Sequence, residues 1–306
     1  MFCKPKPITL GLISEDKIEK WILPHLSRGK RGFRSRVDLK KVILLILKRL
    51  KTGCQWRELS IKECFEEGEI SWQGVYYYFN KWSKDGSFYR VWVALLKENR
   101  SKIDLSSIQI DGSHTPSKNG GDAVGYQKRK SCKTSNSLFL CDNSGQMLSV
   151  STPQSGEHND LYGIEALFKE LLGVLEAADI DTTGLFLNAD PGFDSDGFRQ
   201  SCSEAKIEAN IKENPRNKHK PNESYTYFDD ELYKRRTKIE HANAWMDGFK
   251  ALLVRFETKI SNWMALQWLA FITLFCRKLK VFQSYLMCLM PIQIKILKLH
   301  YFGQPM

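Results

Sequence analysis

Residues 108–114 read IQIDGSH, and residues 185–195 read LFLNADPGFDS. Both begin with apolar residues that are typical of a short strand, and an aspartate follows in each, Asp111 in the first and Asp190 in the second. Carboxylates at the ends of neighbouring strands of one sheet can converge at one edge. The two stretches therefore predict a sheet and a place on it where acids meet.

The segments around these two strands alternate between strand and helix patterns. Further strands are expected at 136–141, 147–151 and 209–211, with turn residues at 143–145 between the first two. Helices are expected at 162–175, at 193–205 and from about residue 230 onward. Antiparallel strands followed by alternating helices and strands predict a mixed sheet with flanking helices, in the α+β or α/β class.

Residues 14–100 carry a helical pattern instead. One helix is expected between Asp38, whose side chain can cap its start, and Gly53, which ends it. Another is expected from the cap Ser71 to residue 83, with polar and aromatic side chains facing outward. A short helix of this kind is typical of a helix-turn-helix recognition element, although an ordinary amphipathic helix has the same pattern.

The formal net charge is +11, from 46 Lys and Arg against 35 Asp and Glu. Residues 28–51 alone contain ten basic residues and one acid. A surplus of this kind predicts attraction to nucleic acid, and a basic enzyme with a solvated surface is the alternative. The candidate DNA contacts in the helical region are Arg34, Arg36, Lys40, Lys41, Gln73 and Lys81.

Composition excludes several classes of protein. With 42% hydrophobic residues the chain can bury a core and is no disordered tail, and eight cysteines are too few for a disulfide scaffold. No apolar run follows the first lysines, so no export signal is expected. The apolar segment 263–276 is shorter than a bilayer span and predicts a buried helix. A reducing cytoplasm is the expected compartment.

A third acid lies on the predicted late helix. Tyr233, Arg236 and Glu240 recur at helical spacing, so one face of the helix carries all three. Three carboxylates (Asp111, Asp190 and Glu240) without a His or Cys cluster suit Mg²⁺, which prefers oxygen ligands. Two such ions about 4 Å apart can activate an attacking oxygen and stabilise the leaving one in phosphoryl transfer. The alternative is that the aspartates are ordinary turn residues.

The segments IDGSHTPSKNGG, LNADPGFDS and YKRRTKIEHANAWMDGFK resemble the three acidic motifs of bacterial insertion-sequence transposases of the DDE class. The resemblance is to the group called insertion sequence family five, within the family-four-like superfamily, and it extends over residues 13 to about 280. It implies a helical DNA-binding leader domain over 1–100 and an RNase H-like catalytic domain over 101–280. Residues 281–306 have no counterpart in it and form an extension of unknown role.

The resemblance also implies an activity. Such an enzyme binds the terminal inverted repeats of its element, cleaves the element ends and joins the 3′-hydroxyls to target DNA. Asp111 would bridge two Mg²⁺ ions, for which Mn²⁺ can substitute, with Asp190 and Glu240 each completing one site. The implied partners are double-stranded DNA and further copies of the chain, in a homodimer or larger synaptic assembly. The implied place is the bacterial cytoplasm, at the nucleoid and not at a membrane.

Residues around the acids are candidate contacts to DNA phosphate within this resemblance. They are Tyr233, Arg235, Arg236, Lys128, Arg129, Lys130, Lys218 and Lys220, and solvated loop charge is the alternative for the two lysine-rich clusters. The chain departs from the family pattern at Asp247 and Pro191, where a lysine is usual, and at Phe193, where a tyrosine is usual. These departures put in doubt any phosphate contact at those positions and leave the three acids intact.

The segment GEHNDL, at 156–161, resembles a further family feature. His158 is a functional candidate in it, and capping of the next helix by Asn159 or Asp160 is the preferred interpretation.

Two other functions stay open. One is a DNA-binding regulator, catalytically inactive or domesticated, that keeps the basic helical region. The other is an RNase H-like nuclease that cuts DNA without strand transfer. Metal-dependent nicking distinguishes an enzyme from the regulator, and a product that joins donor end to target DNA distinguishes the transposase from the nuclease.

Overall fold

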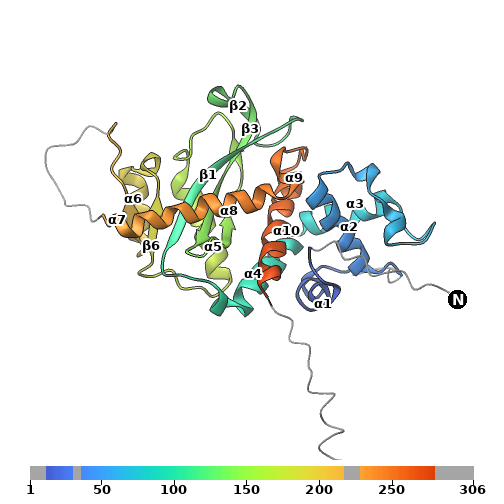
Figure 1. The fold of residues 1–306 in the computed structure, drawn as a ribbon. Helices are drawn as coiled ribbons and strands as arrows, with labels where there is room; N and C mark the ends of the chain where they lie inside the picture. The colour runs from blue at the N-terminus through green and yellow to red at the C-terminus, as the bar shows by residue number, and fades with distance from the viewer. Residues whose placement is uncertain (1–11, 30–35, 217–227, 280–306) are drawn as a thin grey trace, which may run out of the picture.

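The structure is a computed structural model, and it describes residues 12–29, 36–216 and 228–279. The N-terminal third forms a group of helices, and the rest forms a sheet with helices on both of its faces (Figure 1). The two parts share one hydrophobic core.

Four helices and several short turns make up the N-terminal part, and we call this set the leader helices. They are α1 (Glu15–Lys17), a π-helical turn (Ile18–Ile22), a 3₁₀ turn (Leu23–His25), α2 (Leu39–Thr52), 3₁₀ turns at Trp56–Glu58 and Ile61–Glu63, α3 (Trp72–Lys84) and α4 (Ser87–Glu98). A further 3₁₀ turn, Arg100–Lys102, leads to the sheet.

The two predicted capping residues are confirmed. Asp38 accepts a hydrogen bond from the backbone N–H of Lys40 at 2.9 Å and so starts α2. Gly53 ends this helix in the left-handed conformation, with φ of 68°, which glycine adopts without steric cost. Ser71 accepts from the N–H of Gly74 at 3.4 Å and starts α3.

One mixed sheet holds the seven strands of the described residues. They are β1 (Ile108–Pro116), β2 (Gly125–Gln127), β3 (Cys132–Asp142), β4 (Met147–Val150), β5 (Gln154–Ser155), β6 (Phe186–Ala189) and β7 (Glu208–Ile211). The order is β2-β3-β1-β6-β7, and β4 and β5 also pair with β3. β1 is antiparallel to β3 and parallel to β6, which is parallel to β7. This order, with antiparallel strands on one side of β1 and parallel strands on the other, is RNase H-like, as predicted.

The central strands are longer than the sequence predicts. The expected short strand ending at Asp111 is wrong, because β1 continues five residues further to Pro116 and stays paired with β3 down to Thr134. β3 correspondingly begins at Cys132. The added residues of β1 are polar and lack a strand pattern, so pairing with β3 imposes the conformation. Asp111 therefore lies inside a strand, whereas Asp190 directly follows β6, as predicted.

The helices of the sheet part form two layers. They are α5 (Ile164–Ala177), α6 (Asp196–Glu204), α7 (Asp230–Tyr233), α8 (Thr237–Asp247), α9 (Lys250–Leu253) and α10 (Ile260–Lys278), with 3₁₀ turns at Pro191–Phe193 and Lys234–Arg236. Figure 1 shows α8 crossing one face of the sheet in front of β1, with α5 behind the sheet. The site discussed below lies between β1 and α8.

The helix α10 joins the two parts of the molecule. It packs against α2, α3 and α4 on one side and against β4 and α8 on the other. Most of its apolar side chains are buried, and those of Leu266, Phe271 and Phe275 are fully so, which confirms the predicted buried helix. Within the described ranges, no helix has the length and apolar character needed to cross a membrane.

Candidate active site

The register of two neighbouring strands brings the first two acids together. β1 pairs in parallel with β6, with Gln109 opposite Asn188. Asp111 lies two residues beyond Gln109 in β1, and Asp190 lies two residues beyond Asn188, directly after β6. The charge of Asp190 raises the pKa of Asp111, so the two carboxylates lie close together. The Oδ1 atom of Asp190 accepts from the N–H of Gly192 at 2.7 Å, which orients this carboxylate at the end of β6.

The charge state of Asp111 reflects these neighbours. Burial raises the pKa of Asp111 from 3.8 to about 6, and the negative charges of Asp190 and Asp160 act in the same direction. The backbone N–H of Gly112 and the guanidinium of Arg236 oppose them. A carboxylate that burial and like charges destabilise is one that a bound cation would stabilise.

Glu240 stands apart from this pair. Its Oε1 atom lies 2.8 Å from Nη2 of Arg236, and its side chain is 55% exposed. The helix α8 contacts Asp111 one turn later, where Nδ2 of Asn243 donates to Oδ2 of Asp111 at 3.4 Å. Arg236 pairs with Glu240, and its charge also lowers the pKa of Asp111. The structure thus brings two predicted acids together and places the third at the rim.

The donors present are those that a hard divalent cation prefers. The carboxylate of Asp190 lies close enough to Asp111 for its charge to raise the pKa of Asp111, so one cation can be held by both. No three His, Cys, Asp or Glu side chains of residues 12–29, 36–216 and 228–279 are grouped closely enough to hold a metal ion. The residues fit Mg²⁺ in kind, and Glu240 would have to turn inward to add a third carboxylate.

Asp160 is a residue of this region whose place the sequence did not reveal. The N-cap of the helix α5 is Gly163, and no side chain caps this helix, so the predicted capping role of Asn159 or Asp160 is wrong. Instead, Oδ1 of Asp160 accepts from Nδ2 of Asn136 at 2.7 Å. It also lies directly over Gly112, where an added Cβ atom would be 2.1 Å from that oxygen.

Asp160 acts on the site from the other side of β1. Side chains alternate along a strand, so positions 111 and 112 face opposite sides of the sheet. Asp160 therefore influences Asp111 through its charge across the strand. The one sequence signal was Gly112 itself, since a glycine inside a strand often marks a close approach. The nearby His158 stacks on Tyr162, with ring centroids 3.5 Å apart.

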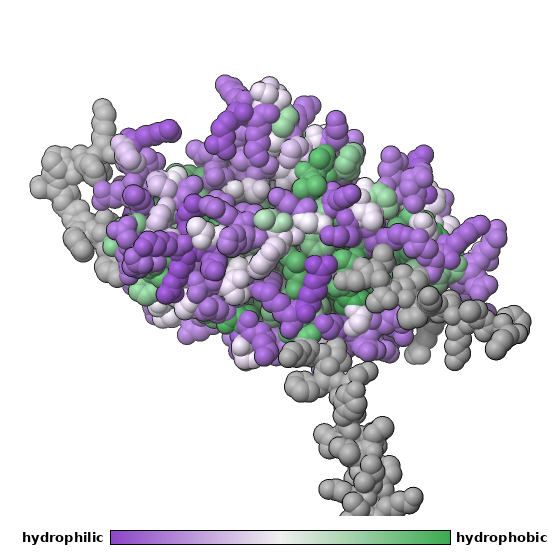
Figure 2. All heavy atoms as spheres, in the orientation of Figure 1, coloured by the Kyte–Doolittle hydropathy of each residue, from purple (hydrophilic) through white to green (hydrophobic). Residues whose placement is uncertain are grey.

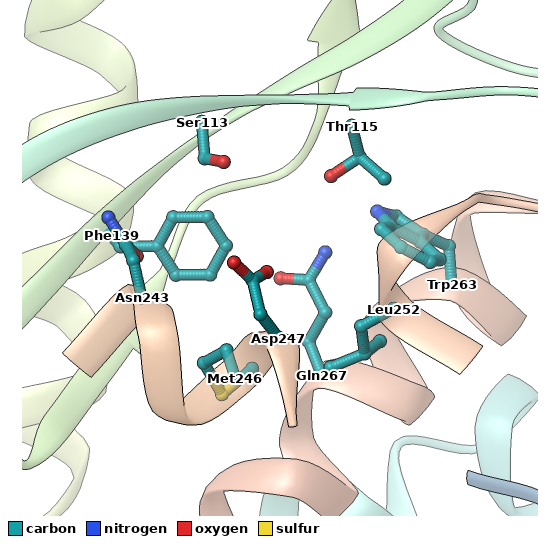
Figure 3. Close-up of a pocket in the computed structure, with 9 residues that line it drawn as sticks. All are labelled: Ser113, Thr115, Phe139, Asn243, Met246, Asp247, Leu252, Trp263 and Gln267. Atoms are coloured by element: carbon teal, nitrogen blue, oxygen red, sulfur yellow. The ribbon is translucent and has the colours of Figure 1, made fainter. Parts of the chain in front are cut away.

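A small pocket of about 70 Å³ continues from the acids along β1 (Figure 3). Ser113 and Thr115 of β1 form its upper wall, and Asp247 of α8 and Gln267 of α10 project into it from below. Asn243 lines the pocket as well as contacting Asp111, so pocket and acids are continuous.

Asp247 in this pocket stands where the family usually has a lysine. Burial raises the pKa of Asp247, and the charge of Lys130 opposes this shift. Lys130 also donates from Nζ to the backbone oxygen of His114 at 2.8 Å, next to the pocket wall. A positive charge therefore stands near this position, although it comes from another segment.

Of the predicted phosphate contacts in the sheet part, Arg236 and Tyr233 lie near the acids, and the other described ones lie along neighbouring segments. Lys128, Arg129 and Lys130 form an exposed 3₁₀ turn after β2, and Arg129 and Lys130 both act on the charge of His114 in β1. Arg235 is exposed and reaches Oγ of Ser106 at 3.4 Å. Tyr233 is half-buried and forms a hydrogen bond with Arg236. Lys218 and Lys220 lie outside the described residues.

The predicted contacts in the leader helices differ in exposure. Arg36 and Gln73 are exposed, whereas Lys40, Lys41 and Lys81 are half-buried. Lys81 donates to the backbone oxygen of Ser27 at 3.4 Å, and Nζ of Lys41 lies 5.3 Å from the ring centroid of Phe65. Arg34 lies outside the described residues.

Acids neutralise part of the basic stretch at 28–51. Lys40 lies 3.7 Å from Glu19, and Lys48 pairs with Glu63. Arg49 is buried and pairs with Glu257 at 2.8 Å, which ties α2 to the segment after α9. The surplus available to a polyanion is therefore smaller than the sequence count suggests.

Comparisons with protein families agree with this geometry. Residues 99–275 match a family model described as "Transposase DDE domain", and residues 16–92 match one described as "Putative transposase of IS4/5 family". No curated protein matches the chain.

Three solved structures show a weaker likeness. The piggyBac transposase synaptic complex with hairpin DNA is 12% identical, with 92% of this chain and 82% of that chain covered and a TM-score of 0.43. The Mos1 transposase paired-end complex with left transposon end is 9% identical, with 83% and 84% covered and a TM-score of 0.27. The Mos1 mariner paired end complex with Mn is 12% identical, with 84% and 83% covered and a TM-score of 0.28. At these scores the fold assignment rests on the strand order.

Proposed function

The chain belongs to the family of transposase DDE domains and is a DNA transposase, and we propose that it cleaves and joins the ends of its own insertion sequence. The observation that carries this proposal is the strand register that sets Asp111 beside Asp190 under the helix α8. A site made of two strands and one covering helix can hold a scissile phosphate between its acids and the basic residues at its rim.

We propose that the two regions of the chain have separate functions. Residues 1–100, which include the leader helices, read the terminal inverted repeats, with the exposed residues Arg36 and Gln73 among the contacts. Residues 101–280 carry the chemistry. The exposed turn at 128–130 and Arg235 hold phosphate and position the DNA without reading its sequence.

Asp111, Asp190 and Glu240 would hold two Mg²⁺ ions, or Mn²⁺ in their place. The chemistry that such ions would supply when bound is activation of the attacking oxygen and stabilisation of the leaving oxygen. Asn243 orients the carboxylate of Asp111, and Asp190 is held by the N–H of Gly192. Glu240 joins when its side chain leaves Arg236, and the freed guanidinium can then bind a phosphate in the bidentate manner that Arg favours.

Two element ends must be joined to one target, so the acting species is a homodimer or a larger assembly on double-stranded DNA. It would act on bacterial DNA at the nucleoid.

The test is an end-cleavage and joining assay with the full chain. Labelled DNA that carries the inverted repeat from the flank of the gene is incubated with Mg²⁺ or Mn²⁺ and a target plasmid. We expect nicked ends and a product in which labelled end and target DNA are covalently joined. Binding without nicking would identify the regulator instead, and nicking without joining would identify the nuclease.

A further inference from the structure

A second cleft, remote from the acids, lies between the leader helices and the segment that connects α9 to α10. Its volume is about 750 Å³. Six of its lining residues matter to its chemistry: Arg49, Trp56, Trp72, Tyr76, Asn119 and Phe256. On the face drawn in Figure 2, hydrophilic residues predominate, and hydrophobic ones gather over α9 and α10, beside this boundary.

The walls of the cleft are aromatic. Trp56 and Tyr76 lie edge to face, with ring centroids 5.2 Å apart, and both are only half-buried. Trp72, at the start of α3, is also half-buried, and Phe256 is 50% exposed. Aromatic rings that are at least partly accessible on both sides of a cleft can form a stacking platform for a flat apolar surface.

The cleft has more hydrogen-bond donors than acceptors that could pair with them. Arg49 uses Nη2 for Glu257, but its Nε and Nη1 have no partner among the described residues, and neither has the indole Nε1 of Trp56. Buried donors without an acceptor are uncommon, and each suggests a missing acceptor. The guanidinium of Arg49 also lies 5.2 Å from the ring centroid of Trp56, so donors and ring form one surface.

The charge of the cleft favours a ligand with electron-rich edges. Its one acidic lining residue is Glu257, which Arg49 already neutralises. Arg57 is exposed at the same cleft and adds a positive charge for which the described part of the chain shows no ion pair. Aromatic faces with excess donors and positive charge match a nucleobase, which has a flat π-face and acceptor atoms along its edges.

We propose that this cleft binds an unpaired nucleobase of the DNA on which the protein acts, an inference that rests on the proposed function. Bases inside a duplex stack on one another, so only an extruded or single-stranded base offers both of its faces. The cleft includes Asn119, three residues beyond the end of β1, and Asp111 lies five residues before that end. At roughly 3.3 Å per strand residue, Asp111 lies about 16 Å from the end of β1, so DNA held at the acids can also reach the cleft.

The test uses the full chain and two short duplexes of one sequence. One is fully paired, and the other carries a single unpaired fluorescent adenine analogue whose emission is quenched by stacking. The readout is the ratio of the two affinities together with the quenching. We expect the wild type to bind the second duplex more tightly and to quench it. We expect Phe256→Ala and Trp72→Ala each to lower that affinity roughly tenfold while binding to the paired duplex is unchanged.

Tyr77→Ala is the matched control. Tyr77 is 61% exposed, lies on the same helix as Trp72 and Tyr76, and does not line the cleft. The affinity ratio should be unaffected by its loss, and Trp72→Phe should retain most of the preference. Equal affinity of the wild type for both duplexes would overturn the inference, as would an unchanged ratio in both cleft variants. Failure to bind either duplex would overturn the proposed function itself.

Discussion

The surroundings of Asp111 disfavour the ionised form of its carboxyl, although this form still predominates at neutral pH. Its burial and the charges of Asp190 and Asp160 raise its pKa to about 6. A buried carboxylate whose ionisation its surroundings disfavour lowers the stability of the fold, and carboxylates with pKa values perturbed in this way are typical of functional sites. The residue is therefore expected to lower stability while it supports activity.

Asp111→Asn should make the protein inactive and more stable. At pH 7 the free energy of unfolding is expected to rise by about 2–3 kcal/mol, because the ionised carboxyl is gone. The folded pKa exceeds the unfolded one, so the native state binds more protons between pH 3.8 and 6. Wild-type stability should thus fall as the pH rises through that window and stay level above it. Denaturant unfolding across this range checks both statements, and a variant that is no more stable at pH 7 would contradict them.

Gly112 is a second residue with a specific consequence. Gly112→Ala should destabilise the protein by about 1–2 kcal/mol, because the new Cβ atom meets Oδ1 of Asp160, which Asn136 holds in place. In an Asp160→Ala background the same substitution should cost clearly less. Urea unfolding of the four proteins of this cycle measures the coupling. Additive effects would mean that Asp160 does not occupy the space over Gly112.

The sequence predicted the contacts of some residues and not those of others. Asp38 and Ser71 act on N–H groups two and three positions away, so the sequence predicts their capping. Asp160 contacts β1 across nearly fifty positions of chain, and its neighbours in sequence equally suit a cap, so the preferred capping interpretation was wrong. Arg49 belongs to a basic run, and only the fold reveals its buried partner Glu257.

At the scale of elements, the basic 3₁₀ turn at 128–130 lies next to β1 through the contact of Lys130 with His114, three residues along the strand from Asp111. It is exposed and carries no ion pair that would neutralise it among the described residues. It is therefore the element best placed to exchange counterions for DNA phosphates.

Lys128→Gln combined with Arg129→Gln should weaken binding to all DNA sequences alike. The slope of log affinity against log salt concentration should become shallower by about 2, because each lost phosphate contact removes about 0.9. Titrations at several salt concentrations measure this slope. The double substitution Lys102→Gln and Lys169→Gln removes the same charge from other exposed positions and should leave the slope nearly unchanged. An equal change in both proteins would assign the effect to net charge alone.

Strands were harder to predict than helices. The helices around Asp38–Gly53 and 263–276 follow local patterns and appear where predicted. β1 beyond Asp111 is polar, and its strand conformation depends on β3, which lies elsewhere in the sequence. The short strands β2 and β5 were not predicted for the same reason, since each exists only by pairing with β3.

At the scale of the whole molecule, the order of elements predicted a mixed sheet with flanking helices, and the family resemblance implied an RNase H-like fold. The strand order β2-β3-β1-β6-β7 confirms both. What the order could not give is how the leader helices sit on the sheet part. The helix α10 and the buried pair of Arg49 with Glu257 fix that arrangement, and they create the aromatic cleft between the two parts.

Of the three acids, Glu240 has the catalytic role that most needs a direct test, because its side chain is paired with Arg236 and stands away from Asp111. The decisive measurement is Mg²⁺-dependent cleavage of labelled end DNA by Glu240→Gln. Glu231→Gln is its matched control, an exposed acid nearby that pairs with Lys234. We predict that Glu240→Gln binds the DNA and cleaves none of it, while Glu231→Gln cleaves like the wild type. Cleavage by Glu240→Gln at the wild-type rate would contradict the three-acid site.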